Sequence, residues 1–497
     1  MVIINGQEPE TIDPGILAGQ ADGRVGLALF EGLTRYNPVD ATPTPGLAER
    51  WELSADGRTY TFHLRTNAVW STGEPITAHD FVYSWLRVLK PETGAANPGH
   101  LFYIRGAQEY HERQDDPSRV GIRSLDDYTF EVQLLEPTPF FLDLCAYPTF
   151  AVVPRSAIEA HGDRWLMHRP LPVSGAYQLE FWNLNDRIRL RKNPLYWDAL
   201  NTSCNLIDLI PCASATTAFN LYEAHQADIV WDKELIPSDL MDVLVARPDF
   251  HPYPYLATYF VRFNLARKPF DDPRVRKALA LAIDKNRIVE KITRAGEKAA
   301  WHQVPPGVAN YTSPPGLGYD PPEARRLLSE AGYPEGRNFP RFQYLYNNQK
   351  SHEKIAVELQ DMWVKALGIR ADLRAVEWKV FLADQRQMNF DLSRSSWIGD
   401  YNDANTFLDM FTSGNDNNRT GWKNQRYDDL VQRANAELDR AKRRSLLQQA
   451  EALLIREELP IVPIYFYQGL EYFDATKIEG ISTNILAEHP LRAIRKK

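Results

Sequence analysis

Short segments in which apolar and polar positions alternate predict β-strands in the first half of the chain. In YTFHLR (60–65), every second residue from Tyr60 to Leu64 is apolar, which is the pattern of a half-buried strand. The segment DYTFEVQLLEP repeats this alternation from Tyr128 to Val132. We therefore expect half-buried strands in this part of the molecule.

Helices are predicted where the apolar period lengthens and a capping residue precedes it. Thr77 followed three residues later by Asp80 predicts a capped helix start, and Asp272 before Pro273 predicts another. The apolar face of that second helix consists of Val275, Leu279, Ala282 and Ile283.

Longer helical patterns follow in the second half of the chain. One helix is expected to begin at Pro322 and to end at Gly332. A single long helical stretch is expected from Tyr427 to about Glu457, followed by the apolar strand PIVPIYFY. Strands and helices intermix throughout, so we expect an α/β or α+β protein of several lobes.

The size and composition of the chain indicate a globular protein of more than one domain. A chain of 497 residues is too long for one ordinary domain, so two or three lobes are expected. The net charge is -8, and Lys and Arg are scattered among acidic residues, which argues against nucleic acid as a partner. The sequence has no run of 18 or more apolar residues, so we expect no membrane span.

The cysteines and the first residues say little about the compartment. Cys145, Cys204 and Cys212 are an odd number without metal-binding spacing, and we expect all three to be free thiols. The opening MVIINGQEPETIDPG has neither a charged n-region nor an apolar h-region. We therefore expect either a cytoplasmic protein or an exported one whose signal has been removed.

Sequence patterns of the common catalytic and metal sites are absent. We find no GxSxG, HExxH, Walker loop or GxGxxG pattern, and HERQD and HEKIA each lack the second histidine of a zinc pair. A calcium loop from Asp400 fails because its sixth position is Asn405 and its twelfth is Phe411. We expect no catalytic residue, no metal and no cofactor, with a hydrolase built from distant residues as the alternative.

The segment SRSSWIGDY (393–401) places one acid, Asp400, beside apolar side chains. A buried carboxylate needs a partner, and the nearby cation Arg394 lies roughly 20 Å away along an extended strand. We therefore expect a ligand to supply the partner of Asp400.

Seven stretches in the same order along nearly the whole chain resemble the solute-binding proteins of peptide ABC transporters, the oligopeptide- and dipeptide-binding family. They are LFEGLTRYN (29–37), PGLAERWELSADGRTYTFHLRTNAVWSTGEPITAHDFVYSW (45–85), SGAYQL (174–179), RKNPLYWD (191–198), FNLARKPFDDPRVRKALALAIDK (263–285), DPPEARRLLSEAGYP (320–334) and DYNDANTFLDMF (400–411). WSTGEPITAHDFVYSW and WIGDY look closest to the oligopeptide-binding branch.

This resemblance implies a three-lobed periplasmic-binding-protein fold of type II, cluster C, with the ligand enclosed between lobes I and III by hinge closure. Carried over to this sequence, lobe I comprises 1–20, 155–256 and 469–497, lobe II comprises 21–154, and lobe III comprises 257–468.

The resemblance also implies the site residues. Asp400 matches the aspartate that receives the ligand's α-ammonium, and Arg394 and His352 match positions that receive the C-terminal carboxylate of ligands of different length. The remaining expected contacts are main-chain groups or side chains at Ser395, Ser396, Trp397, Ile398, Gly399, Glu8, Glu10 and Tyr467.

Structural alternatives stay open for four of these residues. Asp400 could cap the helix that follows, Arg394 could form an ion pair, His352 could be an ordinary residue at a helix N-terminus, and Tyr467 could pack in the core.

One departure from the resemblance concerns a cross-link. Some relatives join the strand before DY to the first strand of lobe III by a disulfide, whereas Ala257 and Ile398 stand at those positions here.

The function implied is a periplasmic or membrane-anchored monomer that captures short peptides in extended conformation and delivers them to an ABC transporter permease. A receptor for a cell-wall (murein) peptide, or for a sugar, opine or metal chelate, is the alternative within the superfamily. The pair of Asp400 and Arg394 favours a zwitterionic ligand over a neutral sugar.

Overall fold

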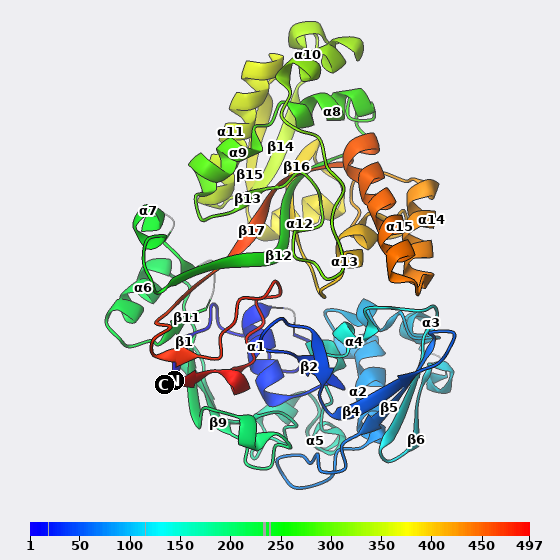
Figure 1. Cartoon of the computed structure of the whole chain (residues 1–497), viewed down its shortest axis with the longest axis vertical. Helices are drawn as coiled ribbons and strands as arrows, with labels where there is room; N and C mark the ends of the chain where they lie inside the picture. The colour runs from blue at the N-terminus through cyan, green and yellow to red at the C-terminus, as the bar shows by residue number, and fades with distance from the viewer. Residues whose placement is uncertain (18, 115, 232–234, 238–239) are drawn as a thin grey trace. The chain divides into compact units, whose positions relative to one another are not determined.

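The chain forms two compact units. The computed structural model describes residues 1–17, 19–114, 116–231, 235–237 and 240–497. Unit 1 comprises Met1–Tyr253 and Gly469–Lys497, and unit 2 comprises Pro254–Gln468 (Figure 1). The chain passes between the units within two long strands, β12 (Phe250–Phe263) and β17 (Ile461–Phe473). The three-lobe division, which would split unit 1 further, stays a prediction.

The larger sheet of unit 1 has short apolar strands at its centre. Its strands in order are the end of β17, β11 (Ile229–Val230), β1 (Val2–Ile4), β10 (Leu206–Ile210), β9 (Arg187–Lys192) and β8 (Tyr177–Asn183). β1 is parallel to both neighbours, and Ile3 and Ile4 are fully buried. Burial on both faces is what a short, wholly apolar segment such as VII predicts.

A second sheet of unit 1 confirms the predicted alternation. Its strands in order are β4 (Ala48–Leu53), β5 (Thr59–Leu64), β7 (Thr129–Gln133) and β6 (Ile122–Asp126). In β5 the buried residues are the predicted apolar ones, whereas Tyr128 lies in the turn before β7 rather than in the strand.

Helices cover these strands from capped starts. The α-helices of unit 1 are α1 (Gln20–Leu29), α2 (Ala78–Leu89), α3 (Ala107–Arg113), α4 (Phe141–Leu144), α5 (Arg155–His161), α6 (Ala215–Glu223) and α7 (Met241–Leu244). Thr77 and Asp80 form the predicted capping box of α2. Trp85 of α2 packs edge-on against Phe130 of β7 with ring centroids 5.1 Å apart, which fixes the helix on the sheet.

The sheet of unit 2 carries β16 in its interior. Its strands in order are β15 (Ala371–Val376), β14 (Phe342–Asn347), β16 (Leu392–Ile398), β12 and β17, and β13 (Lys298–Ala299) also pairs with β17. β14 is parallel to β15 and β16, whereas β12 is antiparallel to β16. This arrangement is a mixed α/β layer structure, as expected.

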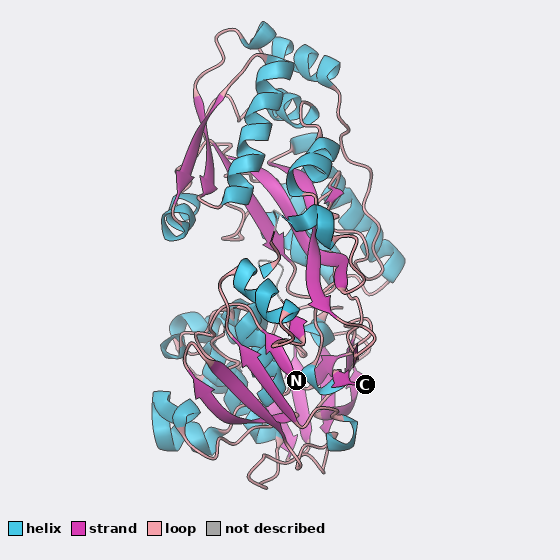
Figure 2. Cartoon of the chain, turned by 90° about the vertical axis from the view of Figure 1, so that its left-hand side faces the viewer, coloured by secondary structure: helices cyan, strands magenta, loops and turns pink. Residues whose placement is uncertain are grey.

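Helices pack along the strands of unit 2 (Figure 2). They are α8 (Pro273–Leu281), α9 (Lys285–Ile288), α10 (Pro321–Glu330), α11 (Lys350–Leu367), α12 (Trp378–Arg386), α13 (Asn405–Leu408), α14 (Gln425–Ala436) and α15 (Arg440–Ala452). Asp272 caps α8 as predicted, and the four predicted apolar positions are buried, although Ala282 and Ile283 lie beyond the end of the helix. α10 begins one residue before the predicted Pro322.

The prediction of one helix from Tyr427 to about Glu457 was wrong. The stretch is divided into α14 and α15, because Asp439 lies between them and its carboxylate accepts hydrogen bonds from the backbone N–H groups of Ala441 and Lys442. A side chain that satisfies the first N–H groups of a helix starts a new helix there. The apolar period continues across the break, which is why the pattern alone did not reveal it.

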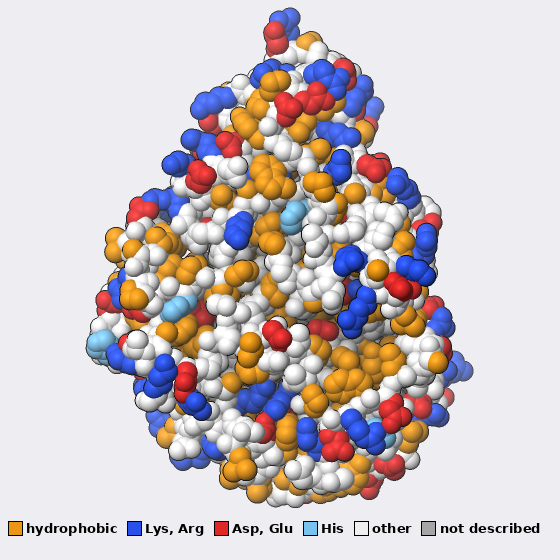
Figure 3. All heavy atoms as spheres, viewed as in Figure 1, with side chains coloured by type: hydrophobic (Ala, Val, Ile, Leu, Met, Phe, Trp, Pro, Cys, Tyr) orange, Lys and Arg blue, Asp and Glu red, His pale blue; other side chains and the backbone are white. Residues whose placement is uncertain are grey.

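Two further strand pairs are β2 (Thr34–Tyr36) with β3 (Pro43–Pro45) and β18 (Ile478–Glu479) with β19 (Arg495–Lys496). All three cysteines are free, as predicted. Among the described residues, no helix is both long and apolar enough to cross a bilayer. Basic and acidic side chains intermix on the face shown in Figure 3.

Candidate functional site

The C-terminal half of β16 has one paired edge and one open edge. Its register with β12 runs from Leu392 opposite Phe263 to Ile398 opposite Ala257. Its register with β14 covers only Leu392 and Ser393. Within the described part of the chain, the stretch 395–398 therefore has no strand on the β14 side. An edge of this kind presents backbone N–H and C=O groups to an added strand.

Asp400 follows this open edge directly. It is half-buried, and its backbone N–H donates to the Thr406 hydroxyl at 3.2 Å. The carboxylate that accepts the Asn405 N–H at the start of α13 belongs to Asp403, at 2.8 Å. Asp403 also forms an ion pair with Arg443 at 2.7 Å. The helix-start position is therefore served by Asp403.

Arg394 lies buried on β16 without an acidic partner among the described residues. Its side chain is 6% exposed. Nε donates to Asn347 Oδ1 at 2.8 Å and Nη1 to the Ser396 hydroxyl at 3.1 Å. The guanidinium lies 5.2 Å from the ring centroid of Phe381. These contacts are all neutral, so the positive charge stays available to an anion.

Tyr259 of β12 brings three predicted site residues together. Its ring centroid lies 5.7 Å from that of His352, 6.3 Å from that of Tyr467 and 5.9 Å from the Arg394 guanidinium. His352 is buried near the start of α11, and Tyr467 is half-buried on β17. No local pattern indicated Tyr259, which looks like an ordinary strand residue in the sequence.

Gln385 of α12 is another contact that the sequence did not reveal. Its amide nitrogen lies 2.9 Å from each of three acceptors, the hydroxyls of Ser393 and Ser395 and the carbonyl oxygen of Arg394. One side chain on a helix thus fixes the backbone of β16 where the open edge begins. Only the tertiary packing of α12 shows this relationship.

The other expected positions on this strand differ in exposure. Trp397 is half-buried opposite Thr258, and its indole N–H has no acceptor among the described residues. Ile398 is 44% exposed. Gly399 is required by packing, because a Cβ there would lie 2.6 Å from Leu256 Cδ2.

Glu8 and Glu10 lie in unit 1 and have contacts there. The Glu8 carboxylate accepts hydrogen bonds from the Trp182 indole at 2.5 Å and from the Asn185 backbone at 3.1 Å. The Glu10 N–H donates to Asp22 Oδ1 at 3.3 Å. The expected role of this backbone in holding a ligand stays a prediction.

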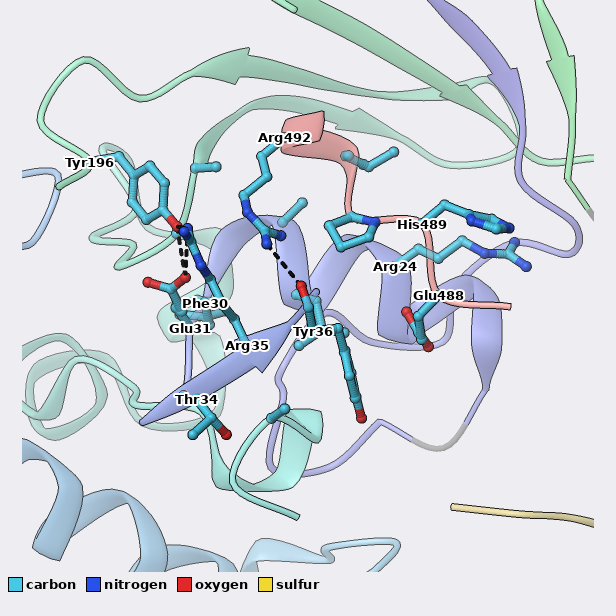
Figure 4. A pocket seen from close by; sticks show the side chains of 18 residues that line it. Arg24, Phe30, Glu31, Thr34, Arg35, Tyr36, Tyr196, Glu488, His489 and Arg492 are labelled. Carbon is cyan, nitrogen blue, oxygen red and sulfur yellow. Dashed lines mark hydrogen bonds and ion pairs between the residues drawn. The ribbon is translucent and has the colours of Figure 1, made fainter. Parts of the chain in front are cut away.

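A pocket of about 620 Å³, which includes space open to solvent, lies in unit 1 and contains none of the predicted site residues (Figure 4). On one side, Glu31 accepts hydrogen bonds from Tyr196 and Trp197, both at 2.7 Å. Arg492 donates to the carbonyl oxygen of Tyr36 at 2.9 Å. Burial raises the pKa of Glu488, on the other side, to about 7.

Comparisons with known proteins place these features in a family context. The sequence profile of the bacterial extracellular solute-binding proteins, family 5 Middle, matches residues 42–419. The periplasmic oligopeptide-binding protein of Salmonella typhimurium is 36% identical over 93% of this chain and 86% of its own length. The probable deoxycholate-binding periplasmic protein of Escherichia coli is 35% identical over 93% of this chain and 87% of its own length.

Solved structures share the fold along the whole chain. The murein tripeptide binding protein of Escherichia coli matches with a TM-score of 0.85 at 33% identity, covering 100% of this chain and 98% of that one. These three relatives are named for three different ligands, so family membership alone does not identify the ligand of this chain.

Proposed function

The chain belongs to family 5 of the bacterial extracellular solute-binding proteins, and from this membership we propose that it captures short peptides in extended conformation and delivers them to an ABC transporter. The family consists of binding proteins, and we assign this chain no catalysis. We place it outside the cytoplasm, in the periplasm or anchored to a membrane, as a monomer.

The observation that carries the proposal is the open edge of β16 at residues 395–398. A peptide added there as a strand gains main-chain hydrogen bonds that do not depend on its side chains. Such bonding suits a receptor for peptides of many sequences. Trp397 then lies where it can contact a ligand side chain.

Two charged residues on either side of this edge fit the two ends of a peptide. Asp400 follows the edge and would receive the α-ammonium. Arg394 precedes it, is buried, and has only neutral partners in the described part of the chain, so it would receive a carboxylate. His352 lies in the same cluster around Tyr259 and would serve ligands of another length.

The alternative ligands can be compared with a nutrient peptide by the charged groups that they carry. A murein peptide carries the same two end groups, so the same residues would hold it. Deoxycholate has a carboxylate but no amine, and would use Arg394 without Asp400. A neutral sugar would leave both charges unmatched, whereas an opine, which carries an amine and carboxylates, could match both as a murein peptide does.

Native mass spectrometry of the purified protein tests the proposal. We expect co-purifying masses that form a ladder of short peptides, displaced by excess trialanine. Calorimetry should then show that trialanine binds and deoxycholate does not. Binding of deoxycholate with no binding of any peptide would overturn the proposal, and cleavage of added peptides would favour a hydrolase.

A further inference from the structure

A second buried arginine, Arg262 of β12, has fewer partners than Arg394. Its side chain is 4% exposed. Nη2 donates to the carbonyl oxygen of Asn417 at 3.1 Å, whereas Nε and Nη1 are buried and have no acceptor among the described residues. Two nitrogens of the guanidinium, which carry three N–H groups between them, are therefore left to donate.

The charges around Arg262 are positive. Burial lowers the pKa of Arg262 to about 9, and the positive charge of the nearby Arg419 contributes a smaller effect in the same direction. Burial and the nearby Arg386 lower the pKa of Arg419 in turn. Asp416 raises the pKa of Arg419 only as a minor effect, and no carboxylate pairs with Arg262 in the described part of the chain.

Arg262 lies on the same face of the sheet as the first residue of the open edge of β16. In the antiparallel register it stands opposite Ser393, while Phe260 stands opposite Ser395. Residues that stand opposite each other share a face, and so do residues two apart along a strand. Arg262 therefore shares its face with Ser395, the first residue of the open edge.

An unpaired buried guanidinium is costly to the folded state unless a ligand supplies its counter-charge. We propose that Arg262, with Arg419, forms a subsite for the carboxylate of an acidic side chain, so that this protein prefers peptides containing Glu or Asp. This inference rests on the proposed peptide-binding function. It assigns the ligand's C-terminal carboxylate to Arg394 and a side-chain carboxylate to Arg262.

Matched tripeptides measured by calorimetry test the preference. Alanine tripeptides with Glu or Gln at each position in turn differ only by one charge. We expect at least one position at which the Glu peptide binds about tenfold or more tightly than the Gln peptide, as one charge-assisted hydrogen bond provides. Because side chains of an extended ligand alternate in direction, neighbouring positions should not both show the preference.

Variants assign the preference to Arg262. Arg262→Met should abolish the difference between Glu and Gln peptides, keep affinity for the Gln peptide, and raise the melting temperature of the free protein. Arg419→Gln, at a half-exposed residue, should reduce the preference and serves if Arg262→Met fails to fold. Arg267→Met, which breaks the surface ion pair with Asp391, should leave the preference unchanged.

The outcomes separate this inference from the proposed function. If no tripeptide binds, the peptide-binding function itself fails. If peptides bind and Glu and Gln versions bind equally at every position, only the acidic subsite is wrong. A preference that persists in Arg262→Met, or that disappears when the C-terminus alone is amidated, would also overturn the assignment to Arg262.

Discussion

Arg262 and Arg394 lie on opposite faces of one strand pair, a single register step apart. Arg394 of β16 stands opposite Val261 of β12, and Arg262 stands opposite Ser393. Both arginines are more than nine-tenths buried. Neither arginine has an acidic partner among the described residues. Unit 2 therefore holds two buried positive charges near the open edge of β16.

The first prediction concerns Asp400 and the amine of the ligand. Asp400→Asn removes the charge and keeps the shape, and loss of one partner from a buried pair costs about 3–5 kcal/mol. Peptide affinity should therefore fall roughly a hundredfold to several thousandfold in calorimetry.

An acetylated peptide provides the control for Asp400. Acetylation removes the other charge of the same pair, so wild-type protein should reject acetylated peptide by a similar factor, and the two losses should not add. Equal binding of free and acetylated peptide by wild-type protein would show that Asp400 does not receive the amine.

The second prediction concerns Arg394 and ligand length. Arg394→Met should weaken tripeptides more than longer peptides, because the family resemblance implies that the carboxylate of a short ligand reaches this residue. Calorimetry with an Ala₂ to Ala₅ series measures the effect, and Arg267→Met again serves as the control. Equal losses at every length would indicate that Arg394 only supports the packing of Phe381 and Asn347.

The third prediction concerns the buried carboxylate of Glu451. It accepts hydrogen bonds from the backbone N–H groups of Gln303 and Val304 and from the Tyr311 hydroxyl. Burial nevertheless raises its pKa from 4.5 to about 7. The folded state therefore retains a proton that the unfolded chain releases between these two values.

Stability should consequently fall as the pH rises through this window, by on the order of 3 kcal/mol for this residue. Glu451→Gln stays neutral and should lack this contribution. The melting temperature of the variant relative to wild type should thus be higher at pH 8 than at pH 4.5. A difference that is the same at both pH values would contradict the prediction.

The fourth prediction concerns Gly469, which begins the second segment of unit 1. A Cβ at this position would lie 2.2 Å from Cε2 of Tyr253. The Tyr253 hydroxyl donates to Glu471 Oε1 at 2.7 Å, and His489 also contacts this oxygen, at 2.8 Å. Gly469→Ala should displace the ring and its hydrogen bond, and destabilise the protein by about 2–4 kcal/mol in urea denaturation.

Gly414→Ala is the matched control for Gly469, because an added Cβ there meets nothing within 4 Å. It should change stability little. If Gly469→Ala is as stable as Gly414→Ala, the ring of Tyr253 has room to move and the close packing at Gly469 is not required.

Local patterns predicted much of the fold because their causes are local. The capping box of Thr77 and Asp80 involves atoms three residues apart, and the alternation in β5 reflects one buried face. The break at Asp439 was missed because, in the sequence, an aspartate that caps a new helix cannot be distinguished from one on the exposed face of a continuous helix.

The candidate site was predictable only in part. The register of Ala257 opposite Ile398 agrees with the positions expected from the family resemblance. Arg262 was not anticipated, because an arginine in an alternating strand is typical of a solvent-exposed face. Its burial depends on the segment around Asn417, which is distant in sequence.

Ala257 and Ile398 stand opposite each other where some relatives have a disulfide, and all three cysteines of this chain are free. The described chain contains no disulfide, so we expect its folding not to depend on disulfide formation. Reducing agents should leave its refolding yield unchanged, and a laboratory host can make it in a reducing cytosol. Cysteines introduced at Ala257 and Ile398 would then form the sole cross-link of the molecule.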